Sequence, residues 1–163
     1  MRAVSNTSPV SNLAIIGRLD LLKSQFSEIC IPAFVWKELC AHPDPGALAA
    51  IQKGLAGGWI QSAAAPASHL LSLLSLQLHR GEAEAIALAV ELNADVVITD
   101  EQEGRELAAQ VGLKVTGALG ILLRDKLDGQ IPALKPEIQS LRSKGRFFIA
   151  PSLEAQVLAA AGE

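Results

Sequence analysis

The hydrophobic pattern of the chain alternates between two kinds of segment. Short runs of β-branched and aliphatic residues end in polar or turn-forming residues, which is typical of buried strands. Longer segments carry apolar residues at helical spacing, and several begin at Ser, Thr or Pro, as helices do. The predicted strands are residues 2–6, 27–32, 94–99, 113–117 and 147–150.

Helices are predicted between these runs, and one long segment stands apart. Residues 45–79 contain only one charged residue, Lys53, and we expect a helical excursion broken at Gly57, Gly58 and Pro66. Strands that are continuous apolar runs and alternate with helices predict a parallel sheet covered on both faces. The expected fold is a single domain over residues 1–163, a three-layer α/β/α sandwich with a mostly parallel sheet of four to five strands.

Composition narrows the classes of function. Half of the 163 residues are apolar, there is no Tyr, and the core must be built from Ala, Leu, Ile and Val. The two cysteines have no metal-binding spacing, and no apolar run is long enough to cross a bilayer, so we expect a cytoplasmic protein without a membrane partner. A net charge of −3 argues against binding nucleic acid through a broad basic face, but not against an enzyme that contacts a few phosphates.

Polar residues fall where predicted strands end or the following helices begin. Asn6 ends the first strand, Asp100 and Glu101 follow VVIT, and Glu38 and Glu82 lie in helices after a strand or turn. In parallel sheets the active crevice lies at the carboxyl ends of the strands, where such groups can converge on a hard cation. Each acid also has a structural explanation, because acids favour the first turns of helices and Asp caps them.

Four segments in order carry a family resemblance: VSNTSPVSNL, IPAFVWKEL, RGEAEAIALAVELNADVVITDEQEGRELA and GLKVTGALGILL. Together they resemble the PIN domain, the nuclease fold of VapC-type toxins. The closest resemblance is to compact PIN-like proteins that carry GEAEA in place of the usual DALIAA. It extends over nearly the whole chain.

The resemblance implies a set of site residues. The four acidic positions of the family fall on Asn6, Glu38, Glu82 and Asp100. Ser8 is the hydroxyl partner of the first position, and Glu101 is an accessory acid. Arg105 either pairs with an acid or reaches a substrate phosphate. Glu84 is left out because two residues separated by two positions on a helix point about 200° apart.

The implied chemistry is metal-assisted hydrolysis of RNA phosphodiester bonds. Mg²⁺ or Mn²⁺ would be held by Glu38, Glu82 and Asp100, with Glu101 in support, and would activate a water. The family also implies a homodimer and, for its toxin members, a small antitoxin partner. The low charge and leucine stripe of the 45–79 segment are typical of a buried core, but such a segment can also offer an apolar surface to either partner. At Asn6 the family usually has Asp, so the site lacks one negative charge that would raise its metal affinity.

Three other functions remain open. A catalytically silent PIN-like module could bind RNA or a protein, and Asn6 favours it. A receiver-like or nucleotide-binding domain is less well supported, because NTS supplies no acidic pair and VTGALG lacks the GxGxxG and GK[ST] patterns. Nucleophilic hydrolysis is poorly supported, because there is no GxSxG motif and the three histidines have no matching partners.

Overall fold

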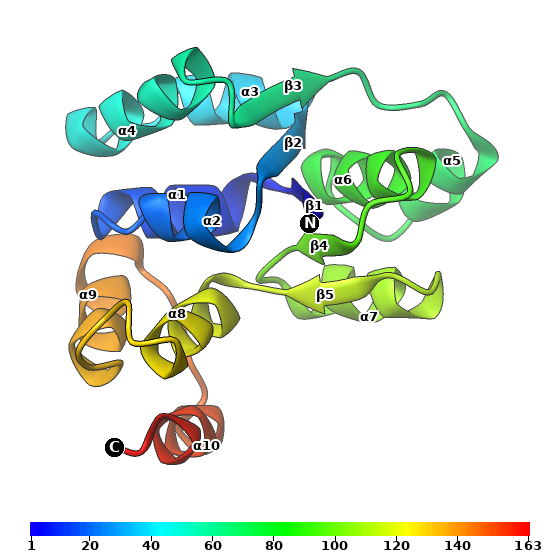
Figure 1. The fold of residues 1–163 in the computed structure, drawn as a ribbon. Coiled ribbons are helices and arrows are strands. Elements are labelled where there is room, and N and C mark those ends of the chain that lie inside the picture. The colour runs from blue at the N-terminus through cyan, green and yellow to red at the C-terminus, as the bar shows by residue number, and fades with distance from the viewer.

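The computed structural model describes residues 1–163 and contains one sheet of five parallel strands in the order β3-β2-β1-β4-β5 (Figure 1). The strands are β1 (Arg2–Ser5), β2 (Glu28–Pro32), β3 (Ile60–Ala63), β4 (Val96–Ile98) and β5 (Lys114–Thr116). The helices are α1 (Thr7–Ile15), α2 (Asp20–Gln25), α3 (Ala33–Cys40), α4 (Pro45–Ala56), α5 (His69–Leu74), α6 (Arg80–Glu91), α7 (Gln102–Gln110), α8 (Ala118–Leu127), α9 (Lys135–Gly145) and α10 (Pro151–Ala161). The predicted three-layer α/β/α fold is confirmed.

Two hydrophobic cores lie on opposite faces of the sheet. Alternate strand residues such as Ala3, Ile29 and Ile98 belong to a core of 25 buried residues, packed with α1 to α4, α8 and α9. The residues between them, such as Val4 and Val97, belong to a second core of 11 residues, packed with α5, α6 and α7. Figure 1 shows α5 to α7 gathered on one side of the sheet and α1, α2, α8 and α9 on the other. None of the helices combines the length and apolar character needed to cross a bilayer.

Two segments differ from the sequence-based prediction. Residues 60–63, predicted within a helical excursion, form the edge strand β3, which pairs with β2 from Ile29↔Ile60 to Pro32↔Ala63. Residues 147–150, predicted as a strand, join α9 to α10 without pairing with the sheet. Ile149 is buried in this segment and Phe148 is exposed, so its apolar residues anchor a connection rather than a strand.

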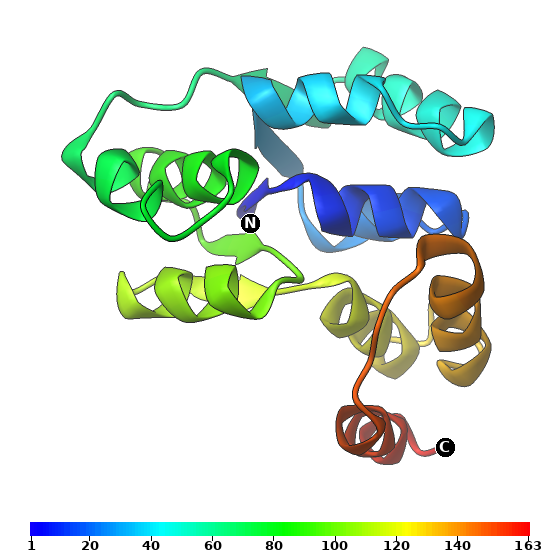
Figure 2. The same ribbon diagram turned by 180° about the vertical axis from the view of Figure 1, so that it is seen from behind.

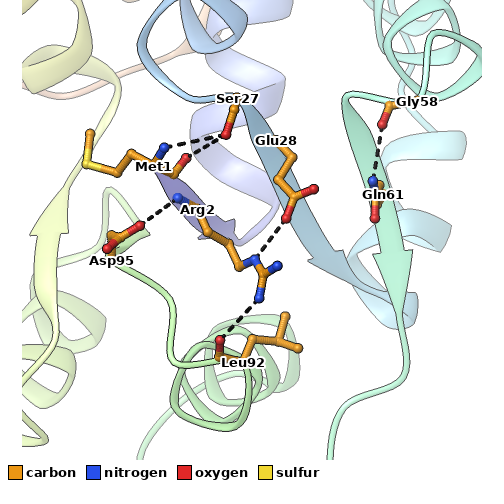
Figure 3. A network of polar contacts seen from close by, with 8 residues as sticks. All are labelled: Met1, Arg2, Ser27, Glu28, Gly58, Gln61, Leu92 and Asp95. Atoms are coloured by element: carbon orange, nitrogen blue, oxygen red, sulfur yellow. Dashed lines mark hydrogen bonds and ion pairs between the residues drawn. The ribbon is translucent and has the colours of Figure 1, made fainter.

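The amino ends of the strands are tied together by Arg2 (Figure 3). Its backbone N–H donates to the Asp95 carboxylate at 2.7 Å, and its guanidinium donates to the Glu28 carboxylate at 2.8 Å and to the Leu92 carbonyl at 3.4 Å. These bonds join β1 to β2 and to the turn before β4. The polar groups at this end of the sheet therefore satisfy one another, in contrast to those at the carboxyl end.

Asp125 is a buried carboxyl group between α8 and α2, away from the carboxyl edge of the sheet. It is 1% exposed and accepts hydrogen bonds from Gln25 at 2.6 Å and from Ser24 at 3.4 Å. Burial raises the pKa of Asp125 above its usual range, and these two hydrogen bonds offset only part of that effect. The ionised form is thus disfavoured in the folded protein.

This raised pKa predicts a pH-dependent effect of Asp125→Asn on stability. As pH rises through the raised value, the folded protein loses a proton that it binds more tightly than the unfolded chain does, so the contribution of Asp125 to the free energy of unfolding falls. Asp125→Asn removes this loss. In urea denaturation, the stability of the variant relative to wild type should increase from pH 4 to pH 7. The same comparison for Asp20→Asn, an exposed aspartate on α2, should be flat; equal slopes for the two variants would contradict the prediction.

Candidate active site

A polar cavity of about 540 Å³ lies at the carboxyl end of β1 and β4. It is bordered by the start of α1, by α3, by the start of α6 and by the residue before α7. Its lining residues are Asn6, Thr7, Ser8, Ser11, Asn12, Phe34, Glu38, His79, Arg80, Gly81, Glu82 and Glu101. Three carboxylates from separate elements, those of Glu38, Glu82 and Glu101, therefore share one cavity. None of them forms an ion pair with a basic residue.

Glu38 enters the cavity from α3. Its Oε1 accepts a hydrogen bond of 2.7 Å from Thr7 Oγ1, at the first position of α1. The same oxygen lies against Gly81, where an added Cβ would approach it to 3.1 Å. Thr7 and Gly81 thus fix where an otherwise exposed carboxylate sits.

Glu82 lies in the first turn of α6 and is the most enclosed of the three acids. The residue is 8% exposed, and its Oε1 is buried without a hydrogen-bond partner. Burial raises the pKa of Glu82, and the charge of Glu101 raises it further. A Cβ at Gly104 on α7 would lie only 2.8 Å from Oε1, so a larger residue there would displace the carboxylate. The environment of Glu82 is one in which a cation would be stabilising.

Asn6 connects the end of β1 to the residues after β4. Its Nδ2 donates at 3.1 Å both to Thr99 Oγ1 and to Glu101 Oε2. Its Oδ1 is buried without a partner. The Asn6 Nδ2 group therefore stabilises the Glu101 carboxylate, while Asn6 Oδ1 remains an acceptor without a donor. An aspartate at this position would place a second carboxylate against Glu101.

Asp100 lies in a neighbouring cavity rather than with Glu38 and Glu82. That cavity is lined by Ser8, Asn12, Asp100, Glu101, Gly145, Arg146, Phe147 and Phe148, and it shares three residues with the first. Asp100 Oδ1 accepts from the Ala118 backbone N–H at 2.7 Å, and Oδ2 accepts from Asn12 Nδ2 at 3.0 Å. Burial raises the pKa of Asp100 to about 6 despite these bonds. Asp100 thus lines the adjoining cavity and not the one that Glu38 and Glu82 line, and its carboxylate holds the start of α8.

The remaining predicted residues divide in the same way. Ser8 lines both cavities, and its Oγ lies 3.5 Å from Asn12 Nδ2. Arg105 lines neither, because its Nη1 donates to the Thr99 carbonyl at 3.0 Å and supports the turn after β4. Glu84, set aside from the sequence, pairs with Arg80 at 2.7 Å and does not line the cavity.

Sequence reasoning missed a polar face on α1. Thr7, Ser11 and Asn12 line the cavity beside the predicted Ser8, whereas Val10 and Leu13 are buried in the core. The signal was present in TSPVSNL, because polar residues at positions i, i+1, i+4 and i+5 fall on one side of a helix. His79 and Arg80, at the start of α6, were also missed as lining residues.

The donor set suits a hard cation, although the acids are not clustered. No three acidic, histidine or cysteine side chains lie close enough together to form a ready metal-binding group. The cavity nevertheless offers carboxylate and amide oxygens, two of which are buried and unsatisfied. Mg²⁺ keeps several waters and binds through one or two carboxylates. The residues present therefore fit a hydrated divalent ion.

A family model described as a PIN domain matches residues 2–163. The chain belongs to the PIN domain family. No curated protein matches it. PIN domains are typically nucleases that act on nucleic acid and generally use divalent metal ions. The position of the acidic cavity, at the carboxyl edge of a parallel sheet, agrees with the active crevice of such folds.

The contact between Asn6 and Glu101 in this PIN domain predicts the effect of restoring an aspartate. Asn6→Asp replaces a charge-assisted hydrogen bond with two adjacent carboxylates, so without metal the free energy of unfolding should fall by about 2 kcal/mol. Mn²⁺ should then raise the melting temperature of the variant more than that of wild type. Thermal unfolding in EDTA and in Mn²⁺ measures both effects.

Asn93→Asp is the matched control, because it makes the same substitution in an exposed turn after α6. It should lack the enlarged response to Mn²⁺. An Asn6→Asp variant as stable as wild type in EDTA would contradict this account of the cavity.

Proposed function

We propose that this protein is a Mg²⁺- or Mn²⁺-dependent endoribonuclease. The observation that carries the proposal is that Glu38, Glu82 and Glu101 all line one open cavity, beside two buried oxygens without hydrogen-bond partners, Asn6 Oδ1 and Glu82 Oε1. Like-charged groups sharing a cavity without a basic partner destabilise the fold unless a cation offsets them. A PIN domain with such a cavity has the features of a nuclease site.

Each residue has a separate task in this proposal. Glu38, Glu82 and Glu101 would hold the ion, and Asn6 would hold Glu101 in place through Nδ2 and present Oδ1. Bound there, the ion would lower the pKa of a water and stabilise charge on the phosphate. The carboxylates of this cavity would orient that water and accept its proton.

Arg80 is the better candidate for a phosphate contact than Arg105. Arg105 is bound to the Thr99 carbonyl. Arg80 lines the cavity, its side chain is 68% exposed, and only its Nε is engaged, by Glu84. Its guanidinium lies over the Phe34 ring at 4.6 Å from the centroid, which holds it at the rim.

The test is cleavage of a labelled single-stranded RNA in Mn²⁺. Glu82→Gln and Glu101→Gln should each lower the cleavage rate by about 100-fold, because each removes a charged ligand. Both variants should also reduce the rise in melting temperature that Mn²⁺ produces in the wild type. Glu91→Gln, an exposed glutamate at the far end of α6, is the matched control and should behave as the wild type. Equal cleavage by all four proteins would reject the proposal.

Asp100→Asn separates the two assignments of that residue. We propose that Asp100 acts on the site by holding Asn12 and the start of α8, so the variant should keep most of the activity. A loss as large as that of Glu82→Gln would instead return Asp100 to the set of ligands.

A second candidate is a PIN-fold module that binds RNA or a protein without cleaving it. Two observations favour it: Asn6 stands at the usual position of an acid, and the carboxylates do not form a ready metal-binding group. RNA binding by the wild type, with equally low cleavage in wild type and Glu82→Gln, would select this candidate.

We further propose a toxin role with a small antitoxin partner and a homodimeric state, on the strength of the family resemblance alone. Leu73 and Leu76, in and after α5, are 63% and 80% exposed and would contribute apolar surface to self-association. Light scattering that finds only monomer at high concentration would remove the homodimer.

A further inference from the structure

The end of α9 and the segment after it border the acidic cavity. Lys144, Gly145 and Arg146 line a hollow together with Thr7 and Glu38. Gly145 to Phe148 line the adjoining hollow that contains Glu101. Both hollows share residues with the acidic cavity. Figure 2 shows this segment passing from α9, beside α1, to α10. Residues 144–148 thus form one flank of the site.

The segment is held against α1 at one point. A Cβ at Gly145 would lie 3.0 Å from Asn12 Oδ1, so a glycine allows the backbone to approach the helix that lines the cavity. Phe147 is partly buried against the main core, and Ile149 is 4% exposed. These anchors fix the path of the residues between them.

The guanidinium of Arg146 takes part in no interaction that stabilises the fold. The Arg146 side chain is the only one among those of the seven arginines that forms neither an ion pair nor a hydrogen bond, and the side chain of Lys144 forms none either. Arg146 also adopts a left-handed backbone conformation, with φ 53°, at the end of α9. Glycine is the usual residue there because it has no Cβ to strain. The arginine is thus not explained by folding.

Phe148 is the most exposed large apolar residue of the chain, at 86%. Its neighbours Phe147 and Ile149 turn inward, so the ring is held outward by two anchored residues rather than left on a loose terminus. An exposed aromatic ring beside free cations is the combination with which proteins bind single-stranded nucleic acid: bases stack on the ring and phosphates contact the cations.

Another hollow that adjoins the cavity has the reverse charge. There, His79, Glu82, Glu101, Gln102, Glu103 and Glu106 line a hollow with four acids and no lysine or arginine. A polyanion is repelled along this side. A polyanion that leaves the site is therefore expected to follow residues 144–148.

We infer that single-stranded RNA leaves the acidic cavity along residues 144–148, with phosphates at Lys144 and Arg146 and one base stacked on Phe148. The inference rests on the proposed ribonuclease function and adds the path of the substrate. Because stacking needs an unpaired base, it also makes single-stranded RNA the preferred form over duplex.

Binding measured without cleavage tests the role of Phe148. The full chain in EDTA is titrated into a fluorescent ten-nucleotide RNA, and anisotropy gives the dissociation constant. Phe148→Ala should weaken binding about tenfold, and Phe148→Trp should restore it. Leu127→Ala, which removes an exposed apolar side chain at the end of α8, should have no effect. The duplex form of the RNA should bind more weakly and should not respond to Phe148→Ala.

Arg146→Gly separates binding from folding. Glycine relieves the left-handed conformation, so the melting temperature should stay level or rise, while RNA binding weakens and its salt dependence decreases by about one phosphate contact. Arg146→Lys should retain most of the binding. Lys144→Ala should also weaken binding, whereas Lys114→Ala, an unpaired exposed lysine at the start of β5, should not.

The outcomes distinguish this inference from the function on which it rests. If wild type cleaves RNA and the Phe148 and Arg146 variants bind normally, the path is wrong and the nuclease proposal stands. If wild type does not cleave but these variants lose binding, the path is supported and the nuclease proposal fails. Absence of both binding and cleavage overturns both.

Discussion

The carboxylates of Glu38, Glu82 and Glu101 share a cavity without a basic partner, and much of the surrounding structure serves to hold them there. The charge of Glu101 acts on Glu82, and this repulsion favours any rearrangement that would separate the two. The parallel sheet resists this, because β1 and β4 are adjacent and the helices that follow the strands are packed on two cores. The hydrogen bonds of Arg2 at the amino end of the sheet fix β1 against its neighbours. The sheet therefore resists a separation of the strands that precede the acids.

Close backbone approach is a second requirement of this arrangement. Gly81, Gly104 and Gly117 lie against the carboxylates of Glu38, Glu82 and Asp100, respectively, each where a Cβ would come within 3.1 Å of an oxygen. Alanine would favour the helix at Gly104 by about 1 kcal/mol. The glycine is therefore explained by the Glu82 carboxylate and not by the helix in which it lies.

Much of this could be predicted from the sequence, and the failures have physical causes. Apolar runs identified β1, β2, β4 and β5, and the topology of parallel sheets placed the site at their carboxyl ends. The edge strand β3 was missed because IQSA is short and half polar, and because its pairing with β2 depends on residues distant in the sequence. The run FFIA resembles a strand, but it joins α9 to α10 without pairing with the sheet, because Phe147 and Ile149 pack against the main core instead. Which of Asp100 and Glu101 enters the cavity depends on the turn after β4, and neighbouring side chains there take different directions.

The number of acids at the family's positions does not by itself describe the site, as Asn6 illustrates. Aspartate there, next to Glu101, would place two carboxylates in contact, whereas the amide donates to Glu101 and to Thr99. Asn6 supplies no carboxylate at the end of β1, but Glu101, after the neighbouring strand β4, supplies one, and the Asn6 amide orients it. The cavity is lined by three carboxyl groups although the residue after β1 is an asparagine. Affinity for a hard cation depends on ligand charge and site rigidity, and an acid fixed by Asn6 and Thr99 supplies both. The asparagine is therefore compatible with a working metal site.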